Sequence, residues 1–478
     1  MTNARDLPEN RLCAFVADLK AEALSSSCRE RLACALLDWF TAGQAGAGSP
    51  EASRLQSFAG TVHGSNGTAP VFGCHDLKAP AAAAFANSAI SHLREVDDGH
   101  RGAMMHPGIV VIPPVMALAT GRPVSYGTVA AAIVAGYEVG LRTGEALGQG
   151  HYGLFHTTAT AGALASAAAS GIVLGLGPEH LRHALGLAAT QAAGLWQFAD
   201  DGALEAKVLH PAFAVRNGMA AAYAAQAGFP GASAWMTGPR GLYRSLHGDG
   251  PIEALDEGLG GKFKIEEAGT KAWPVCGQIF TALDAAQHLL NTVHPAADEI
   301  EAVDVGIYPQ ALRVATVDWP TTPAEVSFSL RFCLATLLTT GHLDPADTAA
   351  PALDSTRLKA FGGRIRVNGE AEYAADFPKR RTCTVSLRLR GGRTVSETRL
   401  FRRGDPEDPL GWSDLLARAP LFAPTVSAES LRIIADWCRS FAKPDRSGVC
   451  IPPASMFRSP DASIARANSG DKKGILQC

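Results

Sequence analysis

Alanine-rich segments, interrupted at short intervals by glycine and proline, dominate the first half of the chain. Alanine and leucine favour helix, and β-branched runs are short here. The stretch 175–178 (GLGP) is typical of a helix that ends at glycine, followed by a helix that opens on proline. Seven segments share this pattern: 12–44, 79–93, 108–121, 127–148, 157–176, 179–194 and 210–228. They predict a large helical domain.

The pattern changes after about residue 265. Apolar residues alternate with polar or small ones at 303–307 and again at 383–389, as in strands with one buried face. Residues 390–393 predict a turn into a second strand at 394–401, which would make a hairpin. Helical patterns return at 281–290, 327–340 and 427–441. We therefore expect a mainly α protein with a smaller α+β domain.

These changes in pattern suggest domain boundaries. We expect a helical domain over residues 1–265, to which residues 405–442 return. An α+β lid domain would occupy residues 266–404. The remaining residues, 443–478, are polar and rich in Pro, Ser and Asp, and we expect them to form a loose tail.

Composition excludes several classes of protein. Hydrophobic residues make up 47% of the chain and charged residues only 19%, which excludes a disordered chain. The net charge of −3 offers no broad basic surface for nucleic acid or an anionic membrane. Residues 152–178 carry no charge, but they are mostly Ala, Gly, Ser and Thr, which favours a buried helix over a membrane span.

The cysteines and the N-terminal residues indicate the cellular location of the protein. Ten cysteines are scattered along the chain, with no C-x-x-C pair, which indicates a reduced protein rather than a disulfide scaffold. The N-terminal residues lack the apolar stretch of a secretory signal. We therefore expect a cytoplasmic protein.

The distribution of histidine and lysine indicates candidate residues for a reaction site. Seven of the 14 histidines fall within residues 63–156, and histidine is the usual proton carrier near neutral pH. Lysine is scarce, and Lys207 is the only one between residues 79 and 261. A compact ammonium group suits a carboxylate ligand, although a surface lysine paired with Glu205 would explain the same pattern.

The densest polar segment is 95–108, EVDDGHRGAMMHPG. Its carboxylates could orient an imidazole and raise its basicity. A metal set of Asp98, His100 and His106 is an alternative, as is a solvated loop with internal salt bridges. The chain has no G-x-G-x-x-G after a strand, no G-x-x-x-x-G-K-[ST] and no G-x-S-x-G, so we expect no nucleotide cofactor and no serine-hydrolase chemistry.

Five ordered motifs resemble the MmgE/PrpD family, which includes 2-methylcitrate dehydratase, cis-aconitate decarboxylase and iminodisuccinate epimerase. They are the acidic and His-Pro segment 95–113, the FHTTATAG helix start within 153–162, the QAAG and KVLH stretches within 188–210, KAWPVC at 271–276 and GDPEDPL at 404–410. The resemblance implies a helical domain with an inserted α+β lid, a cleft between them and a homodimer. It also implies that no cofactor and no metal take part.

The resemblance implies site residues too. The catalytic set would be His106, His156, Lys207, Lys271 and Asp98, and the substrate-binding set would be Asp97, Glu95, His100, Gln191 and His210. His106 would carry the proton, oriented by Asp97 or Asp98, while the two lysines would offset the charge that develops on a carboxylate.

Three departures from the family pattern concern the substrate. Gly99 stands where the decarboxylases have threonine, residues 314–320 contain no tyrosine, and Gly277–Phe280 replaces Arg-x-x-His. The leading prediction is therefore a lyase that removes a proton α to a carboxylate of a small di- or tricarboxylate, similar to 2-methylcitrate dehydratase. The alternatives are an iminodisuccinate-type epimerase, a cis-aconitate decarboxylase, and a carboxylate-binding homologue without turnover.

Overall fold

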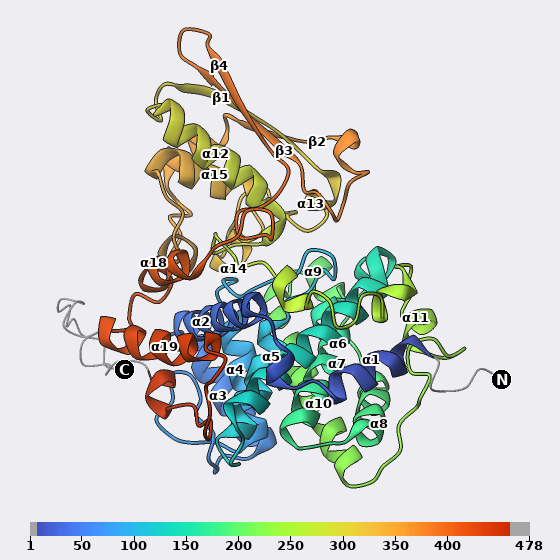
Figure 1. Cartoon of the computed structure of the whole chain (residues 1–478). Coiled ribbons are helices and arrows are strands. Elements are labelled where there is room, and N and C mark those ends of the chain that lie inside the picture. Colours follow the sequence, from blue (N-terminus) through green and yellow to red (C-terminus); the bar gives the residue numbers. More distant parts are fainter. Residues whose placement is uncertain (1–6, 459–478) are drawn as a thin grey trace, which may run out of the picture.

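The computed structural model describes residues 7–458 and has two lobes (Figure 1). The larger lobe is helical, as the sequence predicts. Its helices are α1 (Pro8–Ala17), α2 (Ser26–Ala47), α3 (Pro50–His63), α4 (Pro80–His92), α5 (Gly108–Ala119), α6 (Tyr126–Tyr152), α7 (Thr157–Val173), α8 (Pro178–Ala189), α9 (Gln197–Asp200), α10 (Leu209–Gln226) and α11 (Leu242–Ser245). The chain returns to this lobe with α18 (Trp412–Phe422) and α19 (Ala428–Arg439), which pack on α2.

The centre of the larger lobe is the uncharged helix α7. It packs against α6 and α10, and nearly all of its side chains are buried. The axes can approach because small residues meet: a Cβ on Gly218 of α10 would lie 2.5 Å from the carbonyl oxygen of Ala163. The buried-helix prediction is thus confirmed. Within residues 7–458, no helix is long and apolar enough to cross a membrane.

The predicted helix over 12–44 is wrong in one respect. It is two helices, because residues 18–25 form a connection with a short 3₁₀ turn. Ser25 then caps α2, since its side-chain oxygen accepts a hydrogen bond from the N–H of Cys28 at 3.0 Å.

The smaller lobe contains a four-stranded sheet in the order β2-β1-β3-β4. Strand β1 (Ile300–Ile307) is parallel to β2 (Ile365–Gly369) and antiparallel to β3 (Cys383–Leu389), which forms the predicted hairpin with β4 (Thr394–Arg399). Helices α12 (Phe280–Val293) and α15 (Leu330–Thr340) cover one face (Figure 1). Four short helices complete the lobe: α13 (Pro309–Leu312), α14 (Pro323–Val326), α16 (Pro345–Ala349) and α17 (Thr356–Gly362).

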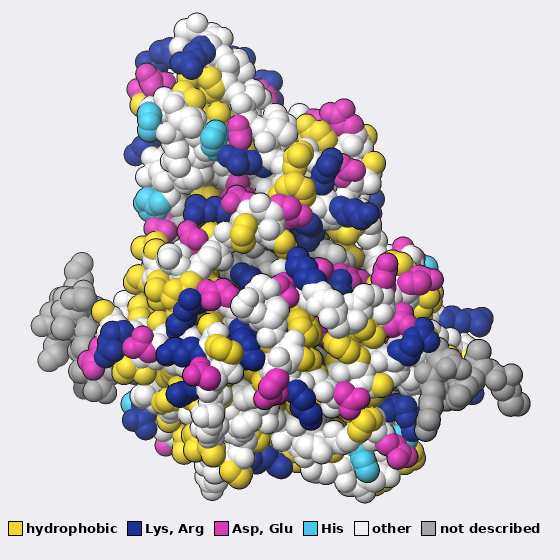
Figure 2. Space-filling model, in the orientation of Figure 1, with side chains coloured by type: hydrophobic (Ala, Val, Ile, Leu, Met, Phe, Trp, Pro, Cys, Tyr) yellow, Lys and Arg dark blue, Asp and Glu magenta, His cyan; other side chains and the backbone are white. Residues whose placement is uncertain are grey.

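Each lobe has its own apolar core. The larger core takes residues from Leu12 to Ala268 and again from Leu415 to Phe457, while the smaller takes Met104 and residues from Val275 to Leu387. The fold class is therefore mainly α with a smaller α+β part. On the face seen in Figure 2, acidic and basic side chains are interspersed, in keeping with the small net charge.

The beginning of the expected loose tail is packed. Met456 and Phe457 are 1% exposed, and the Phe457 ring lies 4.9 Å from that of Phe72 between centroids. The N–H of Gly73 also donates to the carbonyl oxygen of Phe457 at 2.8 Å. A few apolar side chains in a polar stretch are thus enough to hold residues 443–458 on the larger lobe. The rest of the expected tail, 459–478, lies outside the described residues.

Candidate active site

A pocket opens where the two lobes meet. The larger lobe lines it with Glu95, His106, His156, Trp196 and Lys207, and the other side contributes Lys271, Gln278, Phe328, Arg381 and Arg402. Charged side chains therefore reach this pocket from segments that are far apart in the sequence.

The loop between α4 and α5 carries most of the polar groups. Glu95, Asp97 and Asp98 are 8%, 1% and 5% exposed, so the solvated-loop reading of this segment is wrong. Asp98 fastens the loop to the helices: it accepts hydrogen bonds from the N–H of Gly108 at 2.9 Å and from the hydroxyl of Tyr137 at 2.6 Å. A Cβ on Gly108 would lie 2.9 Å from the Asp98 Oδ1 atom, so the start of α5 requires glycine.

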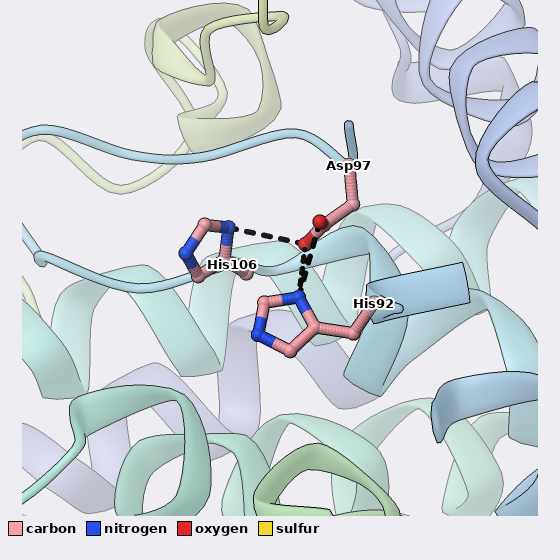
Figure 3. A group of neighbouring side chains, drawn as sticks. All are labelled: His92, Asp97 and His106. Atoms are coloured by element: carbon pink, nitrogen blue, oxygen red, sulfur yellow. Dashed lines mark hydrogen bonds and ion pairs between the residues drawn. The ribbon is translucent and has the colours of Figure 1, made fainter. Parts of the chain in front are cut away.

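Asp97 joins two histidines (Figure 3). Its carboxylate lies 3.0 Å from Nδ1 of His92, the last residue of α4, and 3.1 Å from Nδ1 of His106. Burial raises the pKa of Asp97, but His92, His106 and Lys271 outweigh burial and hold that pKa well below its usual value. Asp97 is therefore an ionised acceptor that holds both rings.

The surroundings of His106 fix its tautomer. Its Nδ1 atom also lies 2.7 Å from the carbonyl oxygen of Asp98, which can only accept, so Nδ1 carries the proton. Burial lowers the pKa of His106 to about 4, although Asp97 opposes the effect. The imidazole is thus neutral at pH 7. Its Nε2 atom lies on the side of the ring away from Asp97 and makes no hydrogen bond within residues 7–458, so it can accept a proton (Figure 3).

The environment of Asp98 shifts its pKa in the opposite direction to that of Asp97. Burial and the nearby Asp38 raise the pKa of Asp98 to about 7. Its side chain contacts Tyr137 and Gly108 rather than the pocket, and only its carbonyl oxygen touches His106. Of the two predicted orienting groups, Asp97 uses its carboxylate and Asp98 uses its backbone.

Glu95 lies between the two predicted lysines. One carboxylate oxygen contacts the ammonium group of Lys207, and the other lies 2.8 Å from Nζ of Lys271. Burial raises the pKa of Glu95, but the two lysines hold it well below its usual value, and Glu95 in turn raises the pKa of Lys207. The alternative pairing of Lys207 with Glu205 is wrong, because Glu205 is exposed and pairs with Arg54.

His156 lies across the pocket as the residue before α7. Its Nδ1 atom is 3.2 Å from Nδ1 of His210, so one ring donates and the other accepts. Burial and Lys207 lower the pKa of His156 well below its usual value, and burial and His92 lower that of His210 to about 4. His210 therefore reaches the pocket through His156.

Two predicted substrate-binding residues have side chains that face other partners. Gln191 is exposed, and its carbonyl oxygen accepts from Asn217. His100 borders the pocket, but its Nδ1 atom accepts from the N–H of Ala103 at 2.9 Å and its Nε2 atom is 3.7 Å from Glu267. Neither side chain is aimed at a ligand in the pocket.

The alternative metal set is not assembled. The Asp98 carboxylate and the His100 ring face other partners, as described above. A different group, His92, Asp97 and His106, does bring its ligand atoms within 4.8 Å of one another. However, both Nδ1 atoms point at the Asp97 carboxylate, and the His106 Nδ1 proton is held by the Asp98 carbonyl oxygen. These contacts use the lone-pair positions that a metal would need.

The sequence motifs did not identify several residues in the pocket or next to it. His92 is a member of the histidine cluster whose position at the end of a helix, three residues before Glu95, could have drawn attention to it. Arg381, Arg402 and Tyr152 had no comparable signal, because the chain holds 32 arginines and neither arginine lies in a recognised pattern.

An imidazole, two ammonium groups and a buried guanidinium thus meet between a helical and an α+β lobe. Comparison with known proteins identifies the family. The MmgE/PrpD N-terminal domain matches residues 10–255 and the C-terminal domain matches residues 273–438. The chain belongs to the MmgE/PrpD family of enzymes, as the sequence motifs indicate.

Several similar curated proteins bear the name cis-aconitate decarboxylase. The protein of Aspergillus terreus is 29% identical over 306 residues, which cover 60% of this chain and 61% of the fungal one. The protein of Mus musculus is 23% identical over 419 residues, or 83% of each chain. The protein of Homo sapiens is 30% identical over 223 residues, or 45% of each. The chain thus spans about three fifths of the fungal relative's length.

Proposed function

We propose that this protein is a cofactor-independent lyase of small tricarboxylates, with decarboxylation of cis-aconitate as its leading reaction. One observation carries the proposal: a neutral His106, with Nε2 free, lies beside ammonium groups that are already fixed in place by Glu95. The names of the relatives favour decarboxylation over the dehydration that the sequence alone places first.

The reaction needs both kinds of group. Loss of CO₂ breaks the C–C bond to the carboxylate on the methylene carbon of cis-aconitate, and that electron pair forms a new double bond. The pair of the former double bond takes a proton at the carbon that bears another carboxylate, which gives 2-methylenesuccinate. Lys207 and Lys271 would offset the charge on that carboxylate, and His106 or His156 would deliver the proton.

Binding would prepare the proton donor. Burial lowers the pKa of His106 to about 4. A ligand with three carboxylates brings negative charge beside the ring, and nearby negative charge favours the imidazolium form. The substrate would therefore raise the pKa of the group that protonates it.

Dehydration of a substrate similar to 2-methylcitrate is the second candidate. Gly99 and Val314 line the pocket, so it offers no side-chain hydroxyl at the positions where the resemblance places threonine and tyrosine in the decarboxylases. Epimerisation of a dicarboxylate such as iminodisuccinate would use the same acid–base groups with no leaving group. A carboxylate-binding homologue without turnover is the non-enzymatic alternative.

One assay separates these candidates. The protein is incubated in D₂O with cis-aconitate, 2-methylcitrate, citrate and iminodisuccinate, and the products are followed by NMR. We expect 2-methylenesuccinate with one deuterium on its saturated carbon. An olefin from a hydroxy acid would favour dehydration, and exchange without a new product would favour epimerisation. Binding without exchange or product for any substrate, in a folded sample, would contradict catalysis.

The quaternary state and location are also proposals. We infer a homodimer from the family resemblance, and two strongly exposed apolar side chains support it: Leu154 is 53% exposed and Leu195 is 60% exposed, next to the pocket residue Trp196. Light scattering after size exclusion would measure the mass in solution. The cytoplasmic location stays a prediction of the sequence.

A further inference from the structure

Arg381 is a buried cation that faces the pocket from the smaller lobe. It lies two residues before β3, and its backbone N–H donates to the carbonyl oxygen of Leu400 at 2.9 Å. The residue is only 4% exposed, yet it lines the pocket. The pairing of β3 with the end of β4 thus fixes the direction from which its side chain enters.

Within residues 7–458, no carboxylate lies within ion-pair distance of the Arg381 guanidinium. Its Nε atom is buried and has no hydrogen-bond partner among these residues, and the Phe377 ring lies 5.6 Å from Cζ. Burial and the neighbouring Arg402 lower the pKa of Arg381. A buried charge without a partner is costly, so this position calls for an anion.

Arg402, unlike Arg381, has a carboxylate partner within the protein. It borders the same pocket, but its guanidinium makes a two-pronged contact with Asp405, with Nε 3.0 Å from Oδ2. Asp405 also accepts from Arg101, whose second partner is Glu407. These two arginines and two carboxylates balance one another and leave no charge for a ligand.

The remaining charges of the pocket do not balance. Lys207 and Lys271 carry two positive charges, and the ionised Glu95 and Asp97 carry two negative ones. The neutral His106 and His156 add none. Arg381 is therefore the unmatched positive charge among the described residues at the centre of the pocket.

We propose that Arg381 binds a second carboxylate of the substrate, one that the Glu95–lysine group does not hold. A guanidinium presents a planar fork that matches a carboxylate in two parallel hydrogen bonds. The substrate then bridges the two lobes, with the carboxylate beside the protonated carbon at Lys207 and Lys271 and another carboxylate at Arg381. This inference deepens the proposed function and rests on it for the substrate class.

The test compares Arg381→Gln with Arg380→Gln. Arg380 is the adjacent residue, exposed and paired with Asp376 at 3.2 Å, so it is a matched control. Ligand-observed NMR titrations at constant ionic strength measure the Kd of propane-1,2,3-tricarboxylate, pentanedioate and pentanoate. We expect Arg381→Gln to weaken both polycarboxylates ~10–100-fold and pentanoate less than about 2-fold. Arg381→Lys should recover part of the loss.

Equal weakening of all three ligands, or no weakening, would overturn the inference, as would a wild type that binds none of them. Thermal unfolding of each variant identifies a folding defect, and Arg381→Lys then provides the comparison. The two proposals fail separately. If the substrate panel gives no turnover while Arg381→Gln shows the expected selectivity, only the reaction is wrong. If turnover occurs and selectivity is unchanged, only the role of Arg381 is wrong.

Discussion

The peptide bond between Asp97 and Asp98 separates two environments. On the pocket side, the imidazoles of His92 and His106 and the ammonium group of Lys271 lower the pKa of Asp97 despite burial. On the core side, burial and Asp38 raise the pKa of Asp98 to about 7. Both residues are almost fully buried, so burial alone does not decide their charge. The charges near each carboxyl group decide it: cations lie around Asp97, whereas the acidic Asp38 lies near Asp98.

The carboxyl groups of Asp97 and Asp98 therefore have different roles in this segment. Asp97 is kept ionised and holds the His106 ring, whereas Asp98 is held by Tyr137 and Gly108 and anchors the loop to α5 and α6. Two adjacent residues of the same type can thus serve chemistry and architecture respectively. Substitutions by asparagine should separate these roles, because asparagine keeps the shape and removes the charge.

The largest effect on turnover is expected from Asp97→Asn. The amide keeps the shape but removes the negative charge that favours an imidazolium on His106, while the carbonyl oxygen of Asp98 still accepts the proton on Nδ1. We expect kcat to fall about 10²–10⁴-fold with the substrate found in the D₂O assay. Imidazole ¹⁵N chemical shifts of His106 report its protonation state directly.

The control for this variant is His342→Gln, which changes an exposed histidine that contacts Asp344 and Asp347 in the smaller lobe. Its kcat should equal that of the wild type. A kcat for Asp97→Asn within a few-fold of the wild type, with the protein folded, would remove the distinction between the two aspartates.

A smaller effect, on stability rather than turnover, is expected from Asp98→Asn. A carboxyl group whose pKa rises from 3.8 to about 7 on folding binds more protons in the folded state than in the unfolded state between those values. Its contribution to the free energy of unfolding is therefore fully present at low pH and is lost as pH rises from about 4 to about 7. Asparagine does not titrate, so the variant lacks this loss.

Urea unfolding at pH 5 and pH 8 measures the effect. The stability of the wild type relative to Asp98→Asn should fall by roughly 2–3 kcal/mol between these pH values. Other titrating groups, such as His106 and His210, are common to both proteins and cancel in the difference. Parallel stability curves for the two proteins would mean that Asp98 is not protonated in the folded state.

The sequence predicted much of this arrangement, and the failures are informative. Alanine-rich segments located most helices within a few residues because small side chains both favour helix and allow close packing. Ordered motifs located His106, Lys207 and Lys271, which the structure brings to one pocket. Gln191 came with its motif, but the contact of that stretch with the site is made by backbone: the carbonyl oxygen of Gly194 accepts from the N–H of His156 at 2.8 Å.

What could not be predicted depends on contacts between distant segments. Arg381 reaches the pocket only because β3 pairs with β4 and the smaller lobe meets the larger one. The opposite pKa shifts of Asp97 and Asp98 likewise depend on His106, Lys271 and Asp38, which the local sequence does not place around them. A motif identifies residue types, whereas their charge states follow from the packed structure.

The smallest effect on kcat/KM is expected at the imidazole of His156, because its partner His210 is neutral. His210 lies 3.2 Å from His156 between Nδ1 atoms and orients it without a charge. His210→Phe removes one hydrogen bond but can retain the edge contact with Phe198, whose ring centroid is 4.9 Å from that of His210. One neutral hydrogen bond contributes about 0.5–1.5 kcal/mol, so kcat/KM should fall only about 2–10-fold. His288→Phe, at a partly exposed position in the smaller lobe, is the control. A loss as large as that of Asp97→Asn would mean that orientation, rather than the negative charge of the partner, makes an imidazole effective in this pocket.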